Sequence, residues 1–127
     1  MERVTVAHEA VVGMFVRGVR PYRGQPLLLL ADPSGRFPFG LRLYINADFV
    51  VDPEPEGGDA FAEPWLGAVY RLECLQDLSI TTAERGEGGD LVLHFGATTV
   101  RGPARVAISG TPLDAARPAA WMVTQGL

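Results

Sequence analysis

The sequence predicts an all-β domain, or a β-rich domain with at most one short helix, built as an antiparallel sandwich or a small closed barrel. Apolar and polar residues alternate with a period of two along most of the chain, which is typical of strands with one buried face. Turn signals rich in glycine and proline separate these runs. Short strands between such turns are typical of sandwiches and barrels.

Seven apolar runs are the expected strands. Residues 27–30 are all leucine, apolar on both faces, so we expect a central strand there. In the run 41–45, alternation places Asn46 on the outward face with Arg42 and Tyr44. The runs that alternate strictly lie at residues 4–6, 12–16, 41–45, 78–81, 91–95 and 105–109. Proline or glycine marks turns at residues 21–24, 32–35, 87–90 and 101–103.

The stretch from 60 to 76 fits two interpretations. Residues 69–73 alternate like a strand, whereas Pro64 suits a first helical turn. Apolar residues at near-helical spacing are Phe61, Trp65, Ala68, Leu72 and Leu75. We expect a strand at 67–74, preceded by one short helical turn.

One domain is expected over residues 1–127. A weak internal repeat aligns residues 12–17 with 66–71 and predicts duplicated halves, 1–51 and 65–127, joined by an acidic linker at 52–64. Each half would be a meander of about four strands, and the halves would share one core because neither buries enough apolar surface alone. The alternative is that any two antiparallel meanders look alike.

The charge composition excludes several classes of protein. The chain has 127 residues, 11 basic side chains that are all arginine, 15 acidic ones, one cysteine and a formal net charge of −4. Without lysine there is no Schiff-base nucleophile and no P-loop. A lone cysteine excludes an internal disulfide and a cysteine-based zinc cage. Nucleic-acid binding needs many cationic phosphate contacts, to which an acidic chain is unsuited.

Membrane and targeting signals are also missing from the sequence. No apolar stretch reaches the ~20 residues of a membrane helix, so no membrane contact is expected. The first residues lack the layout of a signal peptide. We therefore expect a cytoplasmic bacterial protein.

No arrangement of residues suited to catalysis is visible. His8 and His94 lack the spacing of metal ligands, so neither a metal nor another cofactor is expected. Cys74 lies on an apolar strand face without a visible base, which favours a structural thiol. No serine lies in a nucleophile elbow. The sequence therefore favours a protein without catalytic activity.

Carboxylates gather between the two expected halves, where residues 48–63 contain no basic residue. Such a segment presents an anionic surface to a basic partner and speeds their encounter. The alternatives are a solvated, mobile connector, which the composition favours, and a Ca²⁺ site, for which the spacing of an EF-hand is absent. The candidates for partner binding are Asp52, Glu54, Glu56, Asp59 and Glu63.

Four features of the second half form a pattern: Leu66-Gly67, the strand 91–95 that ends in Phe95, the strand 106–108 and Trp121. In this pattern the second half resembles the small bacterial immunity-type β domains, such as the WapI immunity family. The resemblance covers about residues 65–121, and Gly102-Pro103 departs from the pattern. The resemblance implies a non-catalytic protein that binds a partner, and it assigns no catalytic residue.

Three functions are compatible with these observations. The first is a protein-binding domain, immunity-like, that acts by shape and acidic surface on another protein. The second is a small β-barrel that binds or transforms an apolar small molecule. The third is a structural subunit of a homo-oligomer such as a homodimer. Candidates to line a ligand pocket in the second case are Met14, Tyr44, Tyr70, His94, Phe95 and Trp121.

Overall fold

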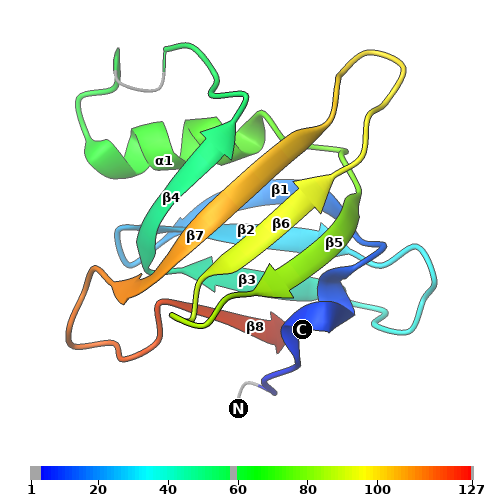
Figure 1. Cartoon of the computed structure of the whole chain (residues 1–127), viewed down its shortest axis with the longest axis horizontal. Coiled ribbons are helices and arrows are strands. Elements are labelled where there is room, and N and C mark those ends of the chain that lie inside the picture. The colour runs from blue at the N-terminus through cyan, green and yellow to red at the C-terminus, as the bar shows by residue number, and fades with distance from the viewer. Residues whose placement is uncertain (1–3, 58–59, 127) are drawn as a thin grey trace.

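The computed structural model describes residues 4–57 and 60–126. Two antiparallel four-stranded sheets pack face to face, with one α-helix at the side of the sandwich (Figure 1). The expected β-rich sandwich with at most one short helix is confirmed. The sheets do not close into a barrel, so the closed-barrel alternative is wrong.

The strands of each sheet come from different parts of the chain. The first sheet has the order β1-β2-β3-β8 and contains β1 (Phe15–Tyr22), β2 (Gln25–Ala31), β3 (Leu41–Ile45) and β8 (Trp121–Gln125). The second sheet has the order β4-β7-β6-β5 and contains β4 (Ala47–Asp52), β7 (Ala104–Pro112), β6 (Leu91–Phe95) and β5 (Ile80–Arg85). A short 3₁₀ helix, η1 (His8–Val11), precedes β1.

Inward-facing residues of both sheets form one core. Leu43 of β3 and Leu91 of β6 are fully buried, whereas their strand neighbours are half-buried or exposed. This alternation buries one face of each strand. β2 lies between β1 and β3, and all four of its leucines are buried. The expected central strand is therefore confirmed.

Backbone hydrogen bonds join the two sheets along one side. The Gly13 amide donates to the Ile80 carbonyl at 2.8 Å, and the Ile80 amide donates to Met14 at 2.7 Å. The Val16 amide donates to Leu78 at 3.1 Å. The start of β1 thus pairs with the segment that leads into β5, which fixes how the layers sit on each other.

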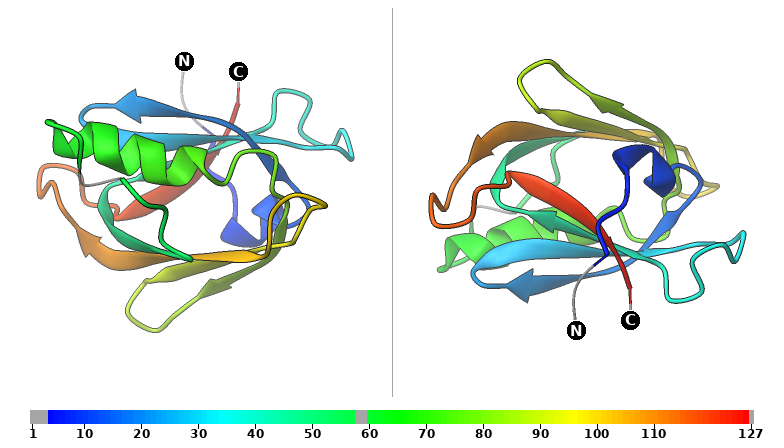
Figure 2. Two further views of the ribbon diagram at one scale, coloured as in Figure 1. Left: turned by 90° about the horizontal axis from the view of Figure 1, so that it is seen from above. Right: turned by 90° about the horizontal axis from the view of Figure 1, so that it is seen from below.

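Residues 64–73 form the helix α1 (Pro64–Glu73), so the strand expected at 67–74 is wrong. The near-helical apolar spacing was the correct signal, because Val69 and Leu72 lie three positions apart and both face the core. The helix packs against β1 and β2 of the first sheet and lies beside β4 of the second (Figure 2). The aligned segments 12–17 and 66–71 therefore differ in secondary structure.

Asn46 stands where the chain passes from β3 of the first sheet to β4 of the second. It was expected on the outward face, but its side chain is buried with 5% exposure. Its Nδ2 faces the carbonyls of Asp114, Arg117 and Ala119 at 3.2–3.3 Å. Its Oδ1 accepts from the Asp114 amide at 3.0 Å. Alternation fails here because Asn46 turns toward the loop between β7 and β8.

Candidate functional site

A cleft of about 790 Å³ lies between α1, β4 and the loop that follows β4. We call it the helix–strand cleft. Gly67 and Ala68 of α1 and Ala47 of β4 are among its lining residues. The other lining residues are Gly24, Gln25, Asp48, Phe49, Glu54, Pro55, Glu56, Gly57, Pro64, Trp65, Arg71 and Leu113.

An ion pair between Arg71 and Glu54 joins the two walls of the cleft. The Arg71 Nε donates to Glu54 Oε1 and one terminal nitrogen donates to Oε2 at 3.1 Å, so the pair is bidentate. The Arg71 guanidinium also lies 4.4 Å from the Phe49 ring centroid. Glu54 follows β4 in the chain, so this contact ties the acidic segment back to the helix.

The same ion pair covers the open edge of β4, which is the end strand of its sheet. Arg71 donates to the Phe49 carbonyl at 3.1 Å, and the Val51 amide donates to Glu54 Oε2 at 3.2 Å. These backbone groups face away from β7 and have no neighbouring strand. Charged side chains at an edge prevent the addition of a further strand. We infer that Arg71 and Glu54 protect this edge.

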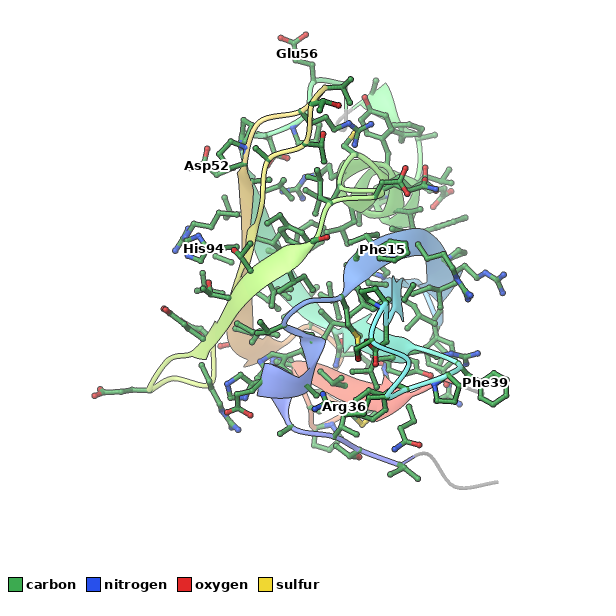
Figure 3. The ribbon with its side chains drawn as sticks, turned by 90° about the vertical axis from the view of Figure 1, so that its right-hand side faces the viewer. Phe15, Arg36, Phe39, Asp52, Glu56 and His94 are labelled. Carbon is green, nitrogen blue, oxygen red and sulfur yellow. The ribbon has the colours of Figure 1, made fainter. Side chains whose placement is uncertain are left out.

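The balance of charge in the cleft is negative. Its lining holds three carboxylates, Asp48, Glu54 and Glu56, and one cation, Arg71, which gives a formal charge of −2. Since Glu54 neutralises Arg71 and the Glu56 side chain points away from the body of the molecule (Figure 3), Asp48 carries the remaining charge at the cleft. Neither Asp48 nor Glu56 is within 4.0 Å of a cationic group in the described ranges. The half-buried rings of Trp65 and Phe49 add aromatic surface.

A tyrosine on the helix fixes the loop beside the cleft. The Tyr70 hydroxyl donates to the Glu56 carbonyl at 2.8 Å, and its ring lies 5.2 Å from that of Phe61. The electrostatic effect of Cys74, followed by desolvation, raises the pKa of Tyr70 above its ordinary value of 10.0. The hydroxyl therefore stays protonated at neutral pH and remains a donor to the loop.

Four of the five acidic candidates lie around this cleft or on the segment that forms it. Glu54 is in the ion pair, and Glu56 points away from the body of the molecule, as Figure 3 shows. Asp52 projects from the outer side of the second sheet (Figure 3). Glu63 precedes the helix and its side chain makes no capping hydrogen bond. Asp59 lies outside the described residues.

The six candidates for a ligand pocket lie in separate places. Met14 and Phe95 are each 2% exposed and fill the core between the sheets. Tyr44 lies on the outer face of the first sheet against Tyr22, and His94 lies on the outer face of the second sheet beside Arg105. Tyr70 is on the helix, and Trp121 begins β8. The structure therefore does not bring these six residues together.

Sequence reasoning missed the residues that shape the cleft. Arg71, Trp65 and Phe49 are not among the candidates. For Arg71 the reason is the strand expected at 67–74, and no sequence pattern places Trp65 or Phe49 at a cleft. The available signal was the helical spacing of Trp65, Ala68 and Leu72, which places Arg71 on the turn next to the acidic loop. If residues 64–73 are expected to form a helix, Arg71 is the one cation of that helix. It then becomes the candidate to form an ion pair with the acidic segment at 48–63.

The described residues hold no cluster of three or more His, Cys, Asp or Glu side chains suited to a metal ion. Cys74 is a half-buried free thiol. Among the helices in the described ranges, none is long and apolar enough to cross a membrane.

Comparison with known proteins finds no matching family model, no matching curated relative and no matching solved structure. The resemblance to immunity-type domains therefore remains a prediction from the sequence.

Proposed function

We propose that this chain is a non-catalytic protein-binding domain that accepts a cationic side chain of its partner in the helix–strand cleft. The observation that carries the proposal is a cleft of about 790 Å³ whose lining combines two aromatic rings with Asp48, a carboxylate that has no ion pair among the described residues. An immunity-like role, in which the partner is a toxin, is the specific form that the sequence resemblance implies.

Electrostatics favours a cation as the group that enters the cleft. Asp48 has no cation near it in the described part of the chain, so an incoming guanidinium or ammonium group gains attraction without breaking an ion pair. A cation over an aromatic face gains about 0.5–1 kcal/mol at an exposed site. The indole of Trp65 offers such a face.

The surroundings of the cleft suit a protein partner. Leu113, which lines the cleft, is 52% exposed, and Phe61, next to Tyr70, is 40% exposed. Leu113 and Phe61 thus offer apolar surface near the acidic groups for a partner to bury. The Arg71–Glu54 ion pair keeps the two walls in place before binding, which lowers the entropy lost on association.

A pair of blocked peptides tests the proposal. One peptide contains a single arginine, and the other contains citrulline, its neutral isostere, at the same position. We expect the arginine peptide to bind at least tenfold more tightly, and we expect Asp48→Asn to weaken its binding. Glu87→Gln, in the exposed loop between β5 and β6, is the matched control.

Equal affinity for the two peptides would contradict the proposal. So would an equal loss of binding in the Glu87→Gln control. Affinity is measured by calorimetry at low ionic strength, where surface electrostatics is least screened.

A further inference from the structure

A second hollow, of about 670 Å³, lies between η1, β8 and the hairpin of β5 and β6. These elements lie at the end of the sandwich opposite α1 (Figure 1). We call this hollow the Trp121 pocket. It shares no lining residue with the helix–strand cleft. Its lining residues are Thr5, Val6, Ala7, His8, Glu9, Arg85, Gly89, Gly110, Pro118, Ala119, Ala120, Trp121, Met122 and Val123.

The indole of Trp121 is held by two other elements. Its Nε1 donates to the Gly89 carbonyl in the β5–β6 loop at 2.7 Å. The His8 ring meets it edge to face, with centroids 6.1 Å apart and planes at 80°. An aromatic ring fixed in this way is a preformed wall, so a ligand that stacks on it loses little entropy by ordering it.

The hairpin that forms another wall is fixed to β7. The Gly110 amide donates to Asp90 Oδ1 at 2.9 Å. A Cβ atom on Gly110 would lie 2.1 Å from the Gly88 carbonyl oxygen, closer than any real contact. Only glycine therefore lets the hairpin approach β7 this closely, and both Gly89 and Gly110 line the pocket.

Arg85 supplies a cation without a partner carboxylate. Its guanidinium lies 5.5 Å from the Trp121 ring centroid. No carboxylate of residues 4–57 or 60–126 lies within 4.0 Å of it, whereas Arg71 and Arg117 each have one. Glu9 also lines the pocket, but its carboxylate is 3.2 Å from His8 Nε2. The free guanidinium fork matches the geometry of a carboxylate.

We infer that the Trp121 pocket binds a small amphipathic carboxylate, with the carboxylate on Arg85 and the apolar body against Trp121. Val6, Ala7, Pro118 and Met122 make much of the remaining lining apolar. Ligand sites of this kind combine an apolar wall with a few polar groups that fix orientation. This inference does not depend on the proposed function, because the two sites are lined by different residues.

Phenylbutyrate is the probe, and phenylbutanamide is its neutral analogue. We expect phenylbutyrate to bind with a millimolar or tighter Kd, to shift the indole N–H resonance of Trp121, and to bind at least tenfold more tightly than the amide. Arg85→Gln should remove that preference. Arg36→Gln is the matched control, since Arg36 is also an exposed arginine stacked on a ring, that of Phe37 at 4.7 Å.

Three results would each overturn the inference: equal binding of acid and amide, no binding at millimolar concentration, or the same loss of preference in Arg36→Gln. Trp121→Phe gives a second measurement, because it keeps a ring but removes the donor to Gly89. Trp121→Phe should weaken the binding of both ligands and preserve the ratio of their affinities. A changed ratio would contradict the assignment of the carboxylate to Arg85.

Discussion

Replacing Asn46 tests how the chain crosses between the sheets. Its amide makes hydrogen bonds to the loop at 113–119 and is 5% exposed. That loop contributes Leu113 to the helix–strand cleft, and Pro118 and Ala119 to the Trp121 pocket. Asn46 therefore positions one wall of each site from a single buried point.

The expected loss of stability follows from the number of hydrogen bonds that the Asn46 side chain makes. The two N–H groups and one oxygen of Asn46 account for three net hydrogen bonds at about 1 kcal/mol each. Asp114 and Ala119 are exposed, so water reaches part of the freed groups and lowers the loss. We expect Asn46→Ala to reduce the free energy of unfolding by about 2–3 kcal/mol, which for a domain of this size lowers Tm by roughly 7–11 °C.

Asn46→Asp removes the hydrogen-bond donors of the Asn46 side chain but keeps its acceptor oxygen. It is nearly isosteric and keeps the acceptor for the Asp114 amide, but it places a carboxylate against three carbonyl oxygens. We expect a larger loss of stability than for Asn46→Ala, because a buried charge then faces only acceptors. Urea unfolding measures both variants. If Asn46→Asp is as stable as the parent chain, the reasoning about donated hydrogen bonds is refuted.

Three further changes have defined outcomes. Arg71→Met removes the charge that covers the edge of β4. We expect the free energy of unfolding to fall by about 1–2 kcal/mol and the variant to self-associate in sedimentation. A monomer at all concentrations would contradict the edge protection. Hydrogen bonds from Ser34 and Phe37 lower the pKa of Asp32 below its ordinary value of 3.8. The contribution of Asp32 to stability is therefore present above pH 3.8 and is lost as the pH falls through the lowered pKa. An NMR titration of this carboxyl with a midpoint at or above 3.8 would refute the lowered pKa. Gly110→Ala forces the β5–β6 hairpin off β7 and should lower the free energy of unfolding by about 1–3 kcal/mol, measured by thermal melts. Gly102→Ala is the control, because its new Cβ has no atom within 4 Å, and it should have little effect in the same measurement.

Some strands were predictable because one of their faces stays in the core over several residues, whereas the run expected at 4–6 forms only an isolated bridge at Thr5. In β3 and β6 the buried residues fall at every second position, as the alternation indicated. The helix was missed because residues 69–73 satisfy both periods: Val69 and Leu72 suit a helix, and the alternation around Tyr70 suits a strand. Five residues are too few to separate the two periods when no tertiary contact is known.

Asn46 shows a second limit of pattern analysis. Alternation assigns a face relative to one sheet, but the chain changes sheets at this residue. Ile45, Asn46 and Ala47 are consequently buried in succession. The acidic segment was visible in the sequence, but its position against Arg71 and Trp65 depends on contacts between elements that no local pattern encodes.

The most direct measurement of the central claim uses the two tryptophans of the chain, one in each site. The indole N–H resonances of Trp65 and Trp121 are followed while the single-arginine peptide is added to the isotope-labelled protein. We expect the Trp65 resonance to move in a saturable way, the Trp121 resonance to stay in place, and the citrulline peptide to move neither. A shift confined to Trp121, or equal shifts with both peptides, would contradict the claim that the helix–strand cleft receives a cationic side chain.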